Sequence, residues 1–434
     1  MKEILIKKIK EKSALIGVIG LGYAGLPIAL RFAENNCNVL GIDIDEKKIE
    51  ILRLKKNPFV HMDSIEVEAA LNKKFEATSD FSKSKKCDVL ILCLPTPINS
   101  EKKPNLSYIE NTMNSIKEFF RKGQALILES TTYPGTTEEL IMPYIEDEGF
   151  IIGNDFFLGY SPEREDPGNK NYNTKTIPKV CSGVTKNCSE IVSAIYLNAV
   201  DEVVNVSSPG TAEMSKLLEN IYRSVNIGLV NEMKIIADEM QIDIHEVINA
   251  AATKPFGFTP FYPGPGLGGH CIPVDPFYLS WKAKQLGLDT KFIELSGEVN
   301  RKMPYWVFSK IEEFYIENNK NFSDLSILVL GLSYKKNIDD LRESPSLTLM
   351  EITKGLGFKV AFSDPFIKYF PPMRDHDFNL KSTVLTKENL ETFDVVILST
   401  DHDDFDYDLI QKHSKILVDT RGVYKKNYKN LIRA

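Results

Sequence analysis

Short apolar runs alternate with amphipathic segments over the first half of the chain. The run Leu15–Ile19 is followed by a glycine-rich turn and by a helical pattern that reaches about Asn36. Other runs of strand length return after polar or helical segments, and such alternation predicts a parallel, doubly wound sheet. The expected strands are Leu15–Ile19, Asn38–Ile42, Asp88–Leu94, Ala125–Glu129, Phe156–Tyr160 and Glu202–Val206.

The pattern changes after Pro209. Apolar residues then recur every three or four positions to about Gln241, which predicts one long helix. More helix is expected at Phe277–Gly287 and Ile293–Phe314, before the polar stretch Glu317–Asp324. A second alternating unit follows, with expected strands at Ser326–Leu330, Lys359–Phe362, Asp394–Leu398 and Ile416–Val418.

These patterns predict an α/β protein with two Rossmann-like, doubly wound domains joined by a long central helix. A chain of 434 residues is too long for one ordinary core. The expected boundaries are 1–208 for the first domain, 209–316 for a central helical region and 317–434 for the second domain.

Composition narrows the class of protein. Apolar residues make up 43% of the chain and charged residues 26%, as in a soluble globular protein, and the net charge of -7 argues against a nucleic-acid or membrane partner. The six cysteines lack paired or zinc-like spacing, so we expect reduced thiols, no metal and a cytoplasmic protein. The stretch Ala14–Leu30 has the length of a signal peptide, but four glycines and Pro27 interrupt it.

The glycine-rich turn carries the first chemical signal. The pattern Gly20-x-Gly22-x-x-Gly25 follows a strand and opens a helix, and Asp43 ends the next strand. In this context glycines let the backbone approach a pyrophosphate, and a carboxylate accepts hydrogen bonds from a ribose diol. A purely structural turn is the alternative. Asp43 favours NAD over NADP, although Lys47 and Lys48 lie nearby. The expected cofactor residues of this segment are Gly20, Gly22, Tyr23, Ala24, Gly25 and Asp43.

Two further strands end in loops at the edge of the sheet where α/β folds bind ligands. Thr96 stands in Leu94-Pro95-Thr96-Pro97, and Thr132 stands in the segment from Glu129 to Gly135. Their small hydroxyls and the prolines are suited to frame a nicotinamide. Each loop taken alone is also typical of an ordinary turn.

The segment Phe261–Pro276 holds four glycines and four prolines in sixteen residues, which is more than a helix or an inner strand accepts. Cys271 lies in this loop, with Asp275 four residues later, and we interpret it as a nucleophile. An inert buried thiol is the alternative, which suits the other five cysteines better. His270 is adjacent to Cys271, and we expect it to be structural.

Other candidate groups are more scattered. Lys216 and Asn220 lie four residues apart on the long helix and share a face, where an ammonium and an amide can stabilise an oxyanion. Glu163, in Ser161-Pro162-Glu163-Arg164, has the chemistry of a general acid or base. Solvated side chains are the alternative for all of these, and for the basic residues near later strand ends, which are Lys335, Lys336, Arg342 and Arg421.

Ordered motifs throughout the chain resemble those of the UDP-glucose/UDP-N-acetylglucosamine (GDP-mannose) dehydrogenase family. The motifs are Gly-Leu-Gly-Tyr-Ala-Gly-Leu-Pro, Pro-Thr-Pro, Glu-Ser-Thr-Thr-Tyr-Pro-Gly, Ser-Pro-Glu-Arg-Glu-Asp-Pro-Gly, Lys-Leu-Leu-Glu-Asn, Gly-Gly-His-Cys-Ile-Pro-Val-Asp-Pro, Tyr-Lys-Lys-Asn-x-Asp-Asp-x-Arg-Glu-Ser-Pro and Asp-Thr-Arg-Gly. The resemblance implies an N-terminal NAD domain, a C-terminal domain for a UDP-sugar, and a homodimer or larger homo-oligomer whose interface uses the central helix.

The resemblance also implies residue roles. Cys271 would form a thiohemiacetal and then a thioester, Lys216 and Asn220 would stabilise oxyanions, and Glu163 and Asp275 would handle protons and water. Thr132 would lie beside cofactor and substrate, and Arg342 near the cofactor. The substrate contacts implied are Glu163, Arg164, Lys216, Asn220, Tyr262, Gly268, Lys335 and Arg421.

The loop around Cys271 resembles the UDP-N-acetylglucosamine branch, which makes precursors of bacterial O-antigen and capsule polysaccharides. UDP-glucose and UDP-N-acetylmannosamine are the alternative substrates. Two competing classes of protein are a single-step hydroxy-acid dehydrogenase, which needs no cysteine, and a non-catalytic nucleotide-binding protein on the same scaffold.

Overall fold

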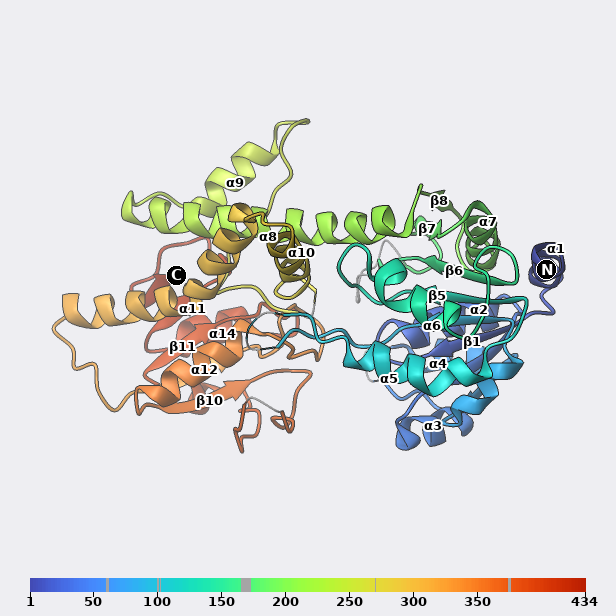
Figure 1. Ribbon diagram of the computed structural model, residues 1–434. Helices are drawn as coiled ribbons and strands as arrows, with labels where there is room; N and C mark the ends of the chain where they lie inside the picture. The colour runs from blue at the N-terminus through green and yellow to red at the C-terminus, as the bar shows by residue number, and fades with distance from the viewer. Residues whose placement is uncertain (60–61, 100, 102, 165–172, 270, 374–375) are drawn as a thin grey trace. The chain divides into compact units, whose positions relative to one another are not determined.

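Two units make up the part of the chain that the computed structural model describes, which is residues 1–59, 62–99, 101, 103–164, 173–269, 271–373 and 376–434. Unit 1 contains Met1–Glu219 and Phe277–Leu288, and unit 2 contains Asn220–Pro276 and Asp289–Ala434. Each unit has its own sheet (Figure 1).

The sheet of unit 1 has the strand order β3-β2-β1-β4-β5-β6-β7-β8. Its neighbouring strands are parallel except β6 and β7, which are antiparallel. The predicted doubly wound sheet is therefore confirmed, with one reversed strand that the sequence pattern did not reveal. The strands are β1 (Leu15–Ile19), β2 (Asn38–Ile42), β3 (Phe75–Thr78), β4 (Val89–Leu92), β5 (Gln124–Leu128), β6 (Phe156–Tyr160), β7 (Lys179–Gly183) and β8 (Val203–Asn205).

Both faces of this sheet are buried. In β4, Val89 and Ile91 belong to one apolar cluster, whereas Leu90 and Leu92 belong to the other, and all four are fully buried. Burial of each such side chain stabilises the fold by about 1.5–3 kcal/mol. This two-sided burial explains why the central strands are continuous apolar runs rather than alternating ones.

Helices cover both faces of the unit 1 sheet. The lysine-rich start of the chain forms the first helix, and its Leu5 and Ile9 are buried in the core. The helices are α1 (Lys2–Lys10), α2 (Gly25–Glu34), α3 (Glu46–Arg53), α4 (Ser64–Leu71), α5 (Ser107–Ile116), α6 (Met142–Glu146) and α7 (Lys186–Tyr196).

The sheet of unit 2 is entirely parallel among its described strands, in the order β10-β9-β11-β12-β13. Its strands are β9 (Ser326–Leu330), β10 (Lys359–Ser363), β11 (Val395–Leu398), β12 (Leu417–Asp419) and β13 (Leu431–Arg433). The helices of unit 2 are α9 (Ile244–Ala252), α11 (Lys291–Glu317), α12 (Pro345–Gly355), α13 (Lys387–Leu390) and α14 (Tyr407–His413).

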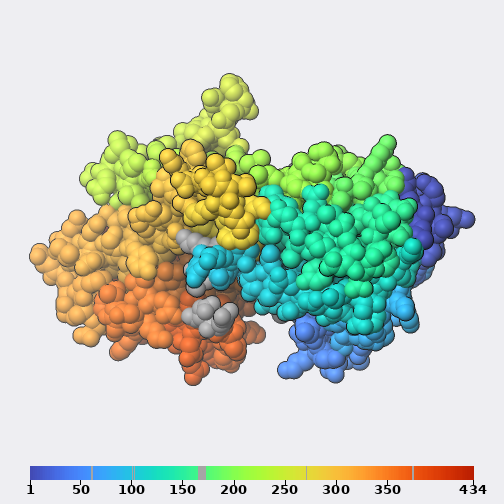
Figure 2. Space-filling view, viewed as in Figure 1, coloured from blue at the N-terminus to red at the C-terminus, as the bar shows by residue number. Residues whose placement is uncertain are grey.

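Two helices contribute residues to both units. The long helix α8 (Pro209–Glu239) confirms the central helix that was predicted to reach Gln241, and α10 (Asp275–Gln285) begins shortly after Cys271. Within unit 2, the segment that follows α9 stands away from the surrounding surface (Figure 2), and its Phe256 is 71% exposed. No helix in the described part of the chain is both long and apolar enough to cross a membrane.

Candidate active site

The turn after β1 has the geometry of a phosphate-binding turn. Gly20 has a φ of +91°, and a Cβ atom there would lie 2.3 Å from the carbonyl oxygen of Cys93. A Cβ at Gly25 would lie 1.8 Å from the carbonyl oxygen of Gly20, whereas one at Gly22 would meet nothing within 4 Å. Gly20 and Gly25 are thus required by packing, and the backbone at Gly22 is open to a ligand.

The start of α2 fits the anionic part of a dinucleotide. Ala24 is the N-cap residue, so no side chain caps the helix. Its first turn can therefore direct N–H groups and the positive end of the helix dipole at a pyrophosphate. Tyr23 lies beside this turn, 40% exposed, with its ring 5.2 Å from that of Phe59.

Asp43 lies at the carboxyl end of β2, as predicted, and is 7% exposed. Its carboxylate accepts hydrogen bonds from the backbone N–H groups of Leu21 (2.8 Å) and Asp45 (2.9 Å). Lys48 forms an ion pair with the same carboxylate at 2.8 Å. Lys48, one of the two lysines near Asp43 that bear on the choice between NAD and NADP, is therefore the ion-pair partner of Asp43.

The loops after β4 and β5 are tightly held. Thr96 is buried, and its carbonyl oxygen accepts a hydrogen bond from the hydroxyl of Tyr278. Thr132 is also fully buried, and its Oγ1 atom has no hydrogen-bond partner among the described residues. An unpaired buried hydroxyl is costly, so this atom fits a site where a bound ligand supplies the missing partner.

Two groups that the sequence analysis missed hold the loop of Thr132. The carboxylate of Glu213, fully buried on α8, accepts hydrogen bonds from the backbone N–H and the hydroxyl of Thr137, at 2.9 and 2.7 Å. Burial raises the pKa of Glu213 above its usual value, and those hydrogen bonds offset the rise only in part. On the other side, Glu129 forms a buried ion pair with Lys179.

Lys216 is not a solvated surface lysine. It is 5% exposed, and its Nζ donates a hydrogen bond to the carbonyl oxygen of Glu163 and lies 3.5 Å from the Oε2 atom of the same residue. Arg164 forms an ion pair with Glu219 at 2.7 Å and donates to the carbonyl oxygen of Pro178. The structure thus brings Glu163, Arg164 and Lys216 together in unit 1. Residues 165–168, the rest of the Ser-Pro-Glu-Arg motif, lie outside the described residues.

The loop that carries Cys271 is fastened within unit 2 by its glycines. The N–H of Gly264 donates to Asn231 Oδ1 at 3.0 Å, and the N–H of Gly269 donates to the carbonyl oxygen of Arg342 at 2.8 Å. A Cβ at Gly268 would lie 2.4 Å from the Cβ of Tyr334. Close packing against Tyr334 therefore requires a glycine at position 268.

Cys271 differs from the other cysteines in burial, since it is partly exposed and the other five are buried. Its carbonyl oxygen accepts the N–H of Asp275, the first residue of α10, at 2.8 Å. The Oδ2 atom of Asp275 accepts a hydrogen bond from Asn220 Nδ2 at 2.6 Å, and both side chains are buried. Cys271, Asp275 and Asn220 are thus joined through hydrogen bonds. His270 lies outside the described residues.

The remaining candidates also lie in unit 2. Tyr262 is half-exposed, and its hydroxyl donates to Asn249 Oδ1 at 2.9 Å. Arg421 donates through Nε to the carbonyl oxygen of Ser399 at 2.6 Å, and burial lowers its pKa. Arg342 binds the carboxylate of Asp340 through two nitrogens, so much of its charge is already compensated.

Within the described residues no group of histidine, cysteine and acidic side chains could hold a metal ion. The candidate site residues fall into two sets. Unit 1 holds the glycine turn, Asp43, Thr96, Thr132, Glu163, Arg164 and Lys216, and unit 2 holds Asn220, Tyr262, Gly268, Cys271, Asp275, Lys335, Arg342 and Arg421.

Comparison with family models matches most of the chain to one family. Residues 14–200 match the NAD binding domain of the UDP-glucose/GDP-mannose dehydrogenase family, 210–302 match its central domain, and 328–426 match its UDP binding domain. The predicted NAD domain and the predicted family are thereby confirmed.

Known proteins similar to the chain carry several substrate names. Protein CapL of Staphylococcus aureus is 36% identical over 96% of this chain and 97% of its own length. A UDP-N-acetyl-D-glucosamine 6-dehydrogenase of Pseudomonas aeruginosa is 35% identical, covering 91% and 92%. The solved structure of a UDP-D-ManNAc dehydrogenase from Pyrococcus horikoshii has a TM-score of 0.87 at 30% identity, covering 96% of this chain and 98% of that one.

Proposed function

The chain belongs to the UDP-glucose/GDP-mannose dehydrogenase family, and we propose that within it the chain oxidises the C6 hydroxyl of UDP-N-acetylglucosamine to the uronic acid. An NAD-dependent nucleotide-sugar 6-dehydrogenase removes four electrons from its substrate, so two NAD molecules are reduced for each sugar. The observation that carries the proposal is that Cys271 is partly exposed, in a loop held by backbone hydrogen bonds, whereas the other five cysteines are buried.

Each of the three predicted parts of the chain has its own role in the proposed function. Residues 1–208 hold NAD through the turn Gly20–Gly25 and Asp43. Residues 317–434 hold the UDP group, with contacts from Lys335 and Arg421. Residues 209–316 carry Cys271 and form the contact between two copies of the chain.

In the first oxidation the substrate loses a proton from its C6 hydroxyl and a hydride from C6. NAD, when bound, supplies the hydride acceptor. Thr132 offers its buried, unpaired hydroxyl to the bound ligands. Lys216 stabilises the negative charge that develops on the sugar oxygen, because a fixed ammonium in a buried site needs little reorganisation.

The second oxidation needs Cys271. Its thiolate adds to the aldehyde carbon, a C–S bond forms, and the former carbonyl oxygen becomes an alkoxide that Lys216 and Asn220 stabilise. The tetrahedral carbon then loses a hydride and becomes a thioester. Asp275 or Glu163 takes a proton from a water molecule, which attacks the thioester carbon. The C–S bond then breaks, which releases the uronic acid and restores the thiolate of Cys271.

Two observations support N-acetylglucosamine as the sugar. The segment Gly-Leu-Gly-Gly-His-Cys-Ile-Pro-Val-Asp-Pro resembles that branch of the family, and the Pseudomonas aeruginosa relative carries that name at 35% identity. UDP-N-acetyl-D-mannosamine is the second candidate, because a relative with that name from Pyrococcus horikoshii is 32% identical over 94% of the chain.

The thioester mechanism is tested by counting NADH with the sugar limiting. We expect two NADH for each sugar and a uronic acid as the product. The variant Cys271→Ala should make no acid and still bind NAD, because the group that forms the covalent bond is lost. The control Cys37→Ala changes a buried thiol and should keep the two-to-one ratio. One NADH for each sugar, or acid formed by Cys271→Ala at a near-normal rate, would contradict the mechanism.

Substrate choice is tested separately with the wild-type protein. We expect kcat/KM for UDP-N-acetylglucosamine to exceed the values for UDP-N-acetylmannosamine and UDP-glucose measured in the same buffer. A clear preference for either of the other sugars would overturn the assignment of the sugar and leave the two-step oxidation standing.

A further inference from the structure

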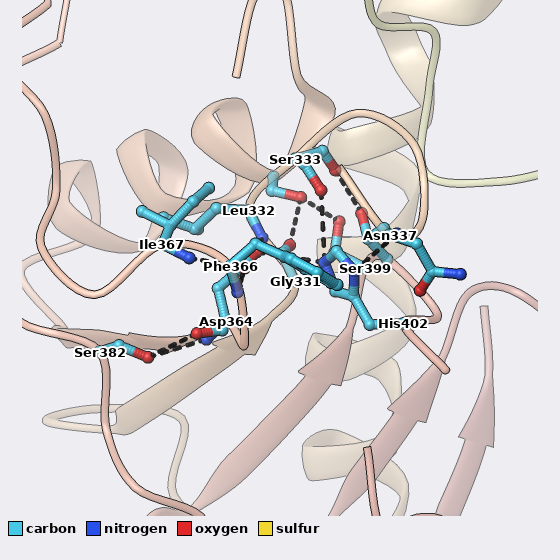
Figure 3. Close-up of polar contacts among 12 residues, drawn as sticks. Gly331, Leu332, Ser333, Asn337, Asp364, Phe366, Ile367, Ser382, Ser399 and His402 are labelled. Carbon is cyan, nitrogen blue, oxygen red and sulfur yellow. Dashed lines mark hydrogen bonds and ion pairs between the residues drawn. The ribbon is translucent and has the colours of Figure 1, made fainter. Parts of the chain in front are cut away.

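A buried polar network lies at the carboxyl edge of the unit 2 sheet. In the strand order β10-β9-β11, the next two strands in the sequence lie on opposite sides of β9. Such a switch point is where open α/β sheets bind ligands. Gly331 follows β9, Asp364 follows β10, and Ser399 follows β11. Figure 3 shows these residues around His402, a residue to which the sequence analysis assigned no role.

Asp364 repeats the position of Asp43 in the other sheet. Each carboxylate accepts the N–H of the residue after the first glycine of its turn, at 2.7 Å for Leu332 with Asp364 and 2.8 Å for Leu21 with Asp43. The remaining partner differs. Asp43 pairs with the partly exposed Lys48, whereas Asp364 lies 3.2 Å from Nε2 of His402, and both of these side chains are fully buried. In unit 2 the carboxylate is therefore directed at a histidine and not at the surface.

The two ring nitrogens of His402 have different partners. Nδ1 accepts a hydrogen bond from the backbone N–H of Asn337 at 3.0 Å, so Nδ1 carries no proton. Nε2 lies 3.2 Å from Asp364 Oδ2 and 3.3 Å from Ser333 Oγ, and it must carry the proton of the neutral ring. The buried carboxylate thus selects the tautomer that can hold Asn337.

The segment held in this way carries Lys335. Asn337 has a φ of +63°, and its side chain donates to Asp403 at 2.6 Å. Ser333 Oγ donates to the carbonyl oxygen of Lys335 at 2.9 Å. Thr400 in turn donates to the carbonyl oxygen of Ser333 at 2.6 Å. The backbone on both sides of Lys335 is thus fixed to the residues that follow β11.

We propose that His402 is a positioning residue for the UDP group, which holds the Ser333–Asn337 segment through Nδ1 while Asp364 fixes its tautomer. The inference rests on the proposed function, in which the domain that carries this segment binds the UDP group. A segment ordered before the ligand arrives binds with a smaller entropic cost, so loss of the hydrogen bond to Asn337 weakens UDP binding.

Two amides at position 402 separate the two nitrogens. In His402→Asn the side-chain oxygen can take the place of Nδ1 and still accept from Asn337. In His402→Gln the amide reaches the place of Nε2, which satisfies Asp364 but leaves Asn337 without its acceptor. We expect UDP affinity, measured by calorimetry, to stay within about threefold in His402→Asn and to fall about tenfold or more in His402→Gln. KM for the UDP-sugar should rise in His402→Gln in the same proportion, with kcat unchanged.

Controls distinguish this role from a structural one and from failure of the proposed function. His376→Leu removes another histidine of unit 2 that pairs with a carboxylate, Glu351 at 3.2 Å, and it should leave UDP affinity unchanged. NAD affinity should be unchanged in all variants. Wild-type UDP affinity in His402→Gln, or equal losses in His402→Asn and His402→Gln, overturns the positioning role. If Lys335→Met binds UDP normally while His402→Gln does not, the contact assigned to Lys335 fails and the positioning role stands.

The tautomer has its own spectroscopic signature. In protein labelled with 15N histidine, the resonances lost in His402→Asn should show an unprotonated Nδ1 and a protonated Nε2. The opposite tautomer at His402 would overturn the proposal even if the affinities changed, because that ring could not accept from Asn337.

Discussion

Burial separates the cysteines of this chain by reactivity. The thiolate is the nucleophilic form of cysteine, and burial raises the pKa of Cys87 and of Cys181 to about 12. Burial also raises the pKa of Cys37. Cys271 is the cysteine that is not buried, and it lies in a loop whose backbone is fixed on both sides. The chemistry proposed for this residue therefore agrees with its surroundings as well as with its motif.

Two lysines of unit 2 show how the surroundings change the effect of a charge on stability. Lys234 on α8 is 6% exposed and lies 5.3 Å from the centre of the Trp306 ring, and burial lowers its pKa to about 8. Burial also lowers the pKa of Lys310, but its ion pairs with Glu313 and with Asp238 outweigh that effect and raise it to about 12. Folding thus disfavours the charge of Lys234 and favours that of Lys310.

The variant Lys234→Met should therefore be more stable than the wild type at pH 7. Because the folded pKa lies below the unfolded value, the unfolded state binds more protons between about pH 8 and 10.5, and wild-type stability gains over that window. The advantage of Lys234→Met should shrink as the pH rises through it. Thermal unfolding from pH 7 to 10 measures this, with Lys310→Met as the control that is expected to lose stability at pH 7. Loss of stability in Lys234→Met at pH 7 would contradict the argument.

At the scale of elements, the turn from β1 to α2 separates packing from binding. Gly25 is the first residue of α2 and has backbone directly beside it, whereas the position of a Cβ at Gly22 is empty. Gly25 therefore allows the close contact between strand and helix, and Gly22 leaves room for a ligand.

This difference gives a paired prediction. Gly22→Ala should unfold at the wild-type temperature but bind NAD about tenfold or more weakly, because the new methyl group occupies the path of the pyrophosphate. Gly25→Ala should lose about 1–3 kcal/mol of stability, since α2 has to move away from Gly20. Thermal unfolding and NAD calorimetry on both variants measure the two effects. Full NAD affinity in Gly22→Ala would show that the cofactor does not approach this turn.

The elements themselves were predictable where the hydrophobic pattern is strong. Five-residue apolar runs such as Leu15–Ile19 and Ser326–Leu330 are strands with those bounds in the structure. The strand β7 escaped prediction because it begins with a lysine and ends with a serine and a glycine, which interrupt the apolar pattern. That lysine is accommodated by Glu129, which lies 50 residues earlier, and a pairing over such a distance leaves no periodic signal.

The site was predictable only as far as residue types in motifs allow. Gly20, Asp43 and Cys271 stand in local patterns whose chemistry can be inferred from their neighbours. The residues that hold these side chains in place do not stand in such local patterns. Glu213 supports a loop 76 residues earlier, and His402 contacts a carboxylate 38 residues earlier. Such contacts depend on the folded sheet, because only the fold brings strand ends from distant parts of the chain to one edge.

At the scale of the whole molecule, exposed apolar side chains form a stripe along one surface of α8. Large apolar side chains stand exposed along its unit 2 portion at spacings of seven, four and three residues, and one more follows just after the end of the helix. Such spacing is typical of a helix that packs against another helix. Contiguous exposed apolar stripes mark interaction surfaces. The residues and their exposed fractions are Tyr222 (51%), Leu229 (55%), Met233 (40%), Ile236 (45%) and Met240 (62%).

We expect the wild-type protein to form a homodimer or a larger assembly through this stripe. Two charges placed in it, by Leu229→Lys with Ile236→Lys, should yield monomers, because burying unpaired ammonium groups at an interface costs more than the contact returns. Light scattering after size-exclusion chromatography gives the mass of each assembly. Leu356→Lys changes another exposed leucine of unit 2, 49% exposed and outside the stripe, and should leave the mass unchanged. If the double variant keeps the wild-type mass and elutes as a folded protein, another surface of the chain joins the copies.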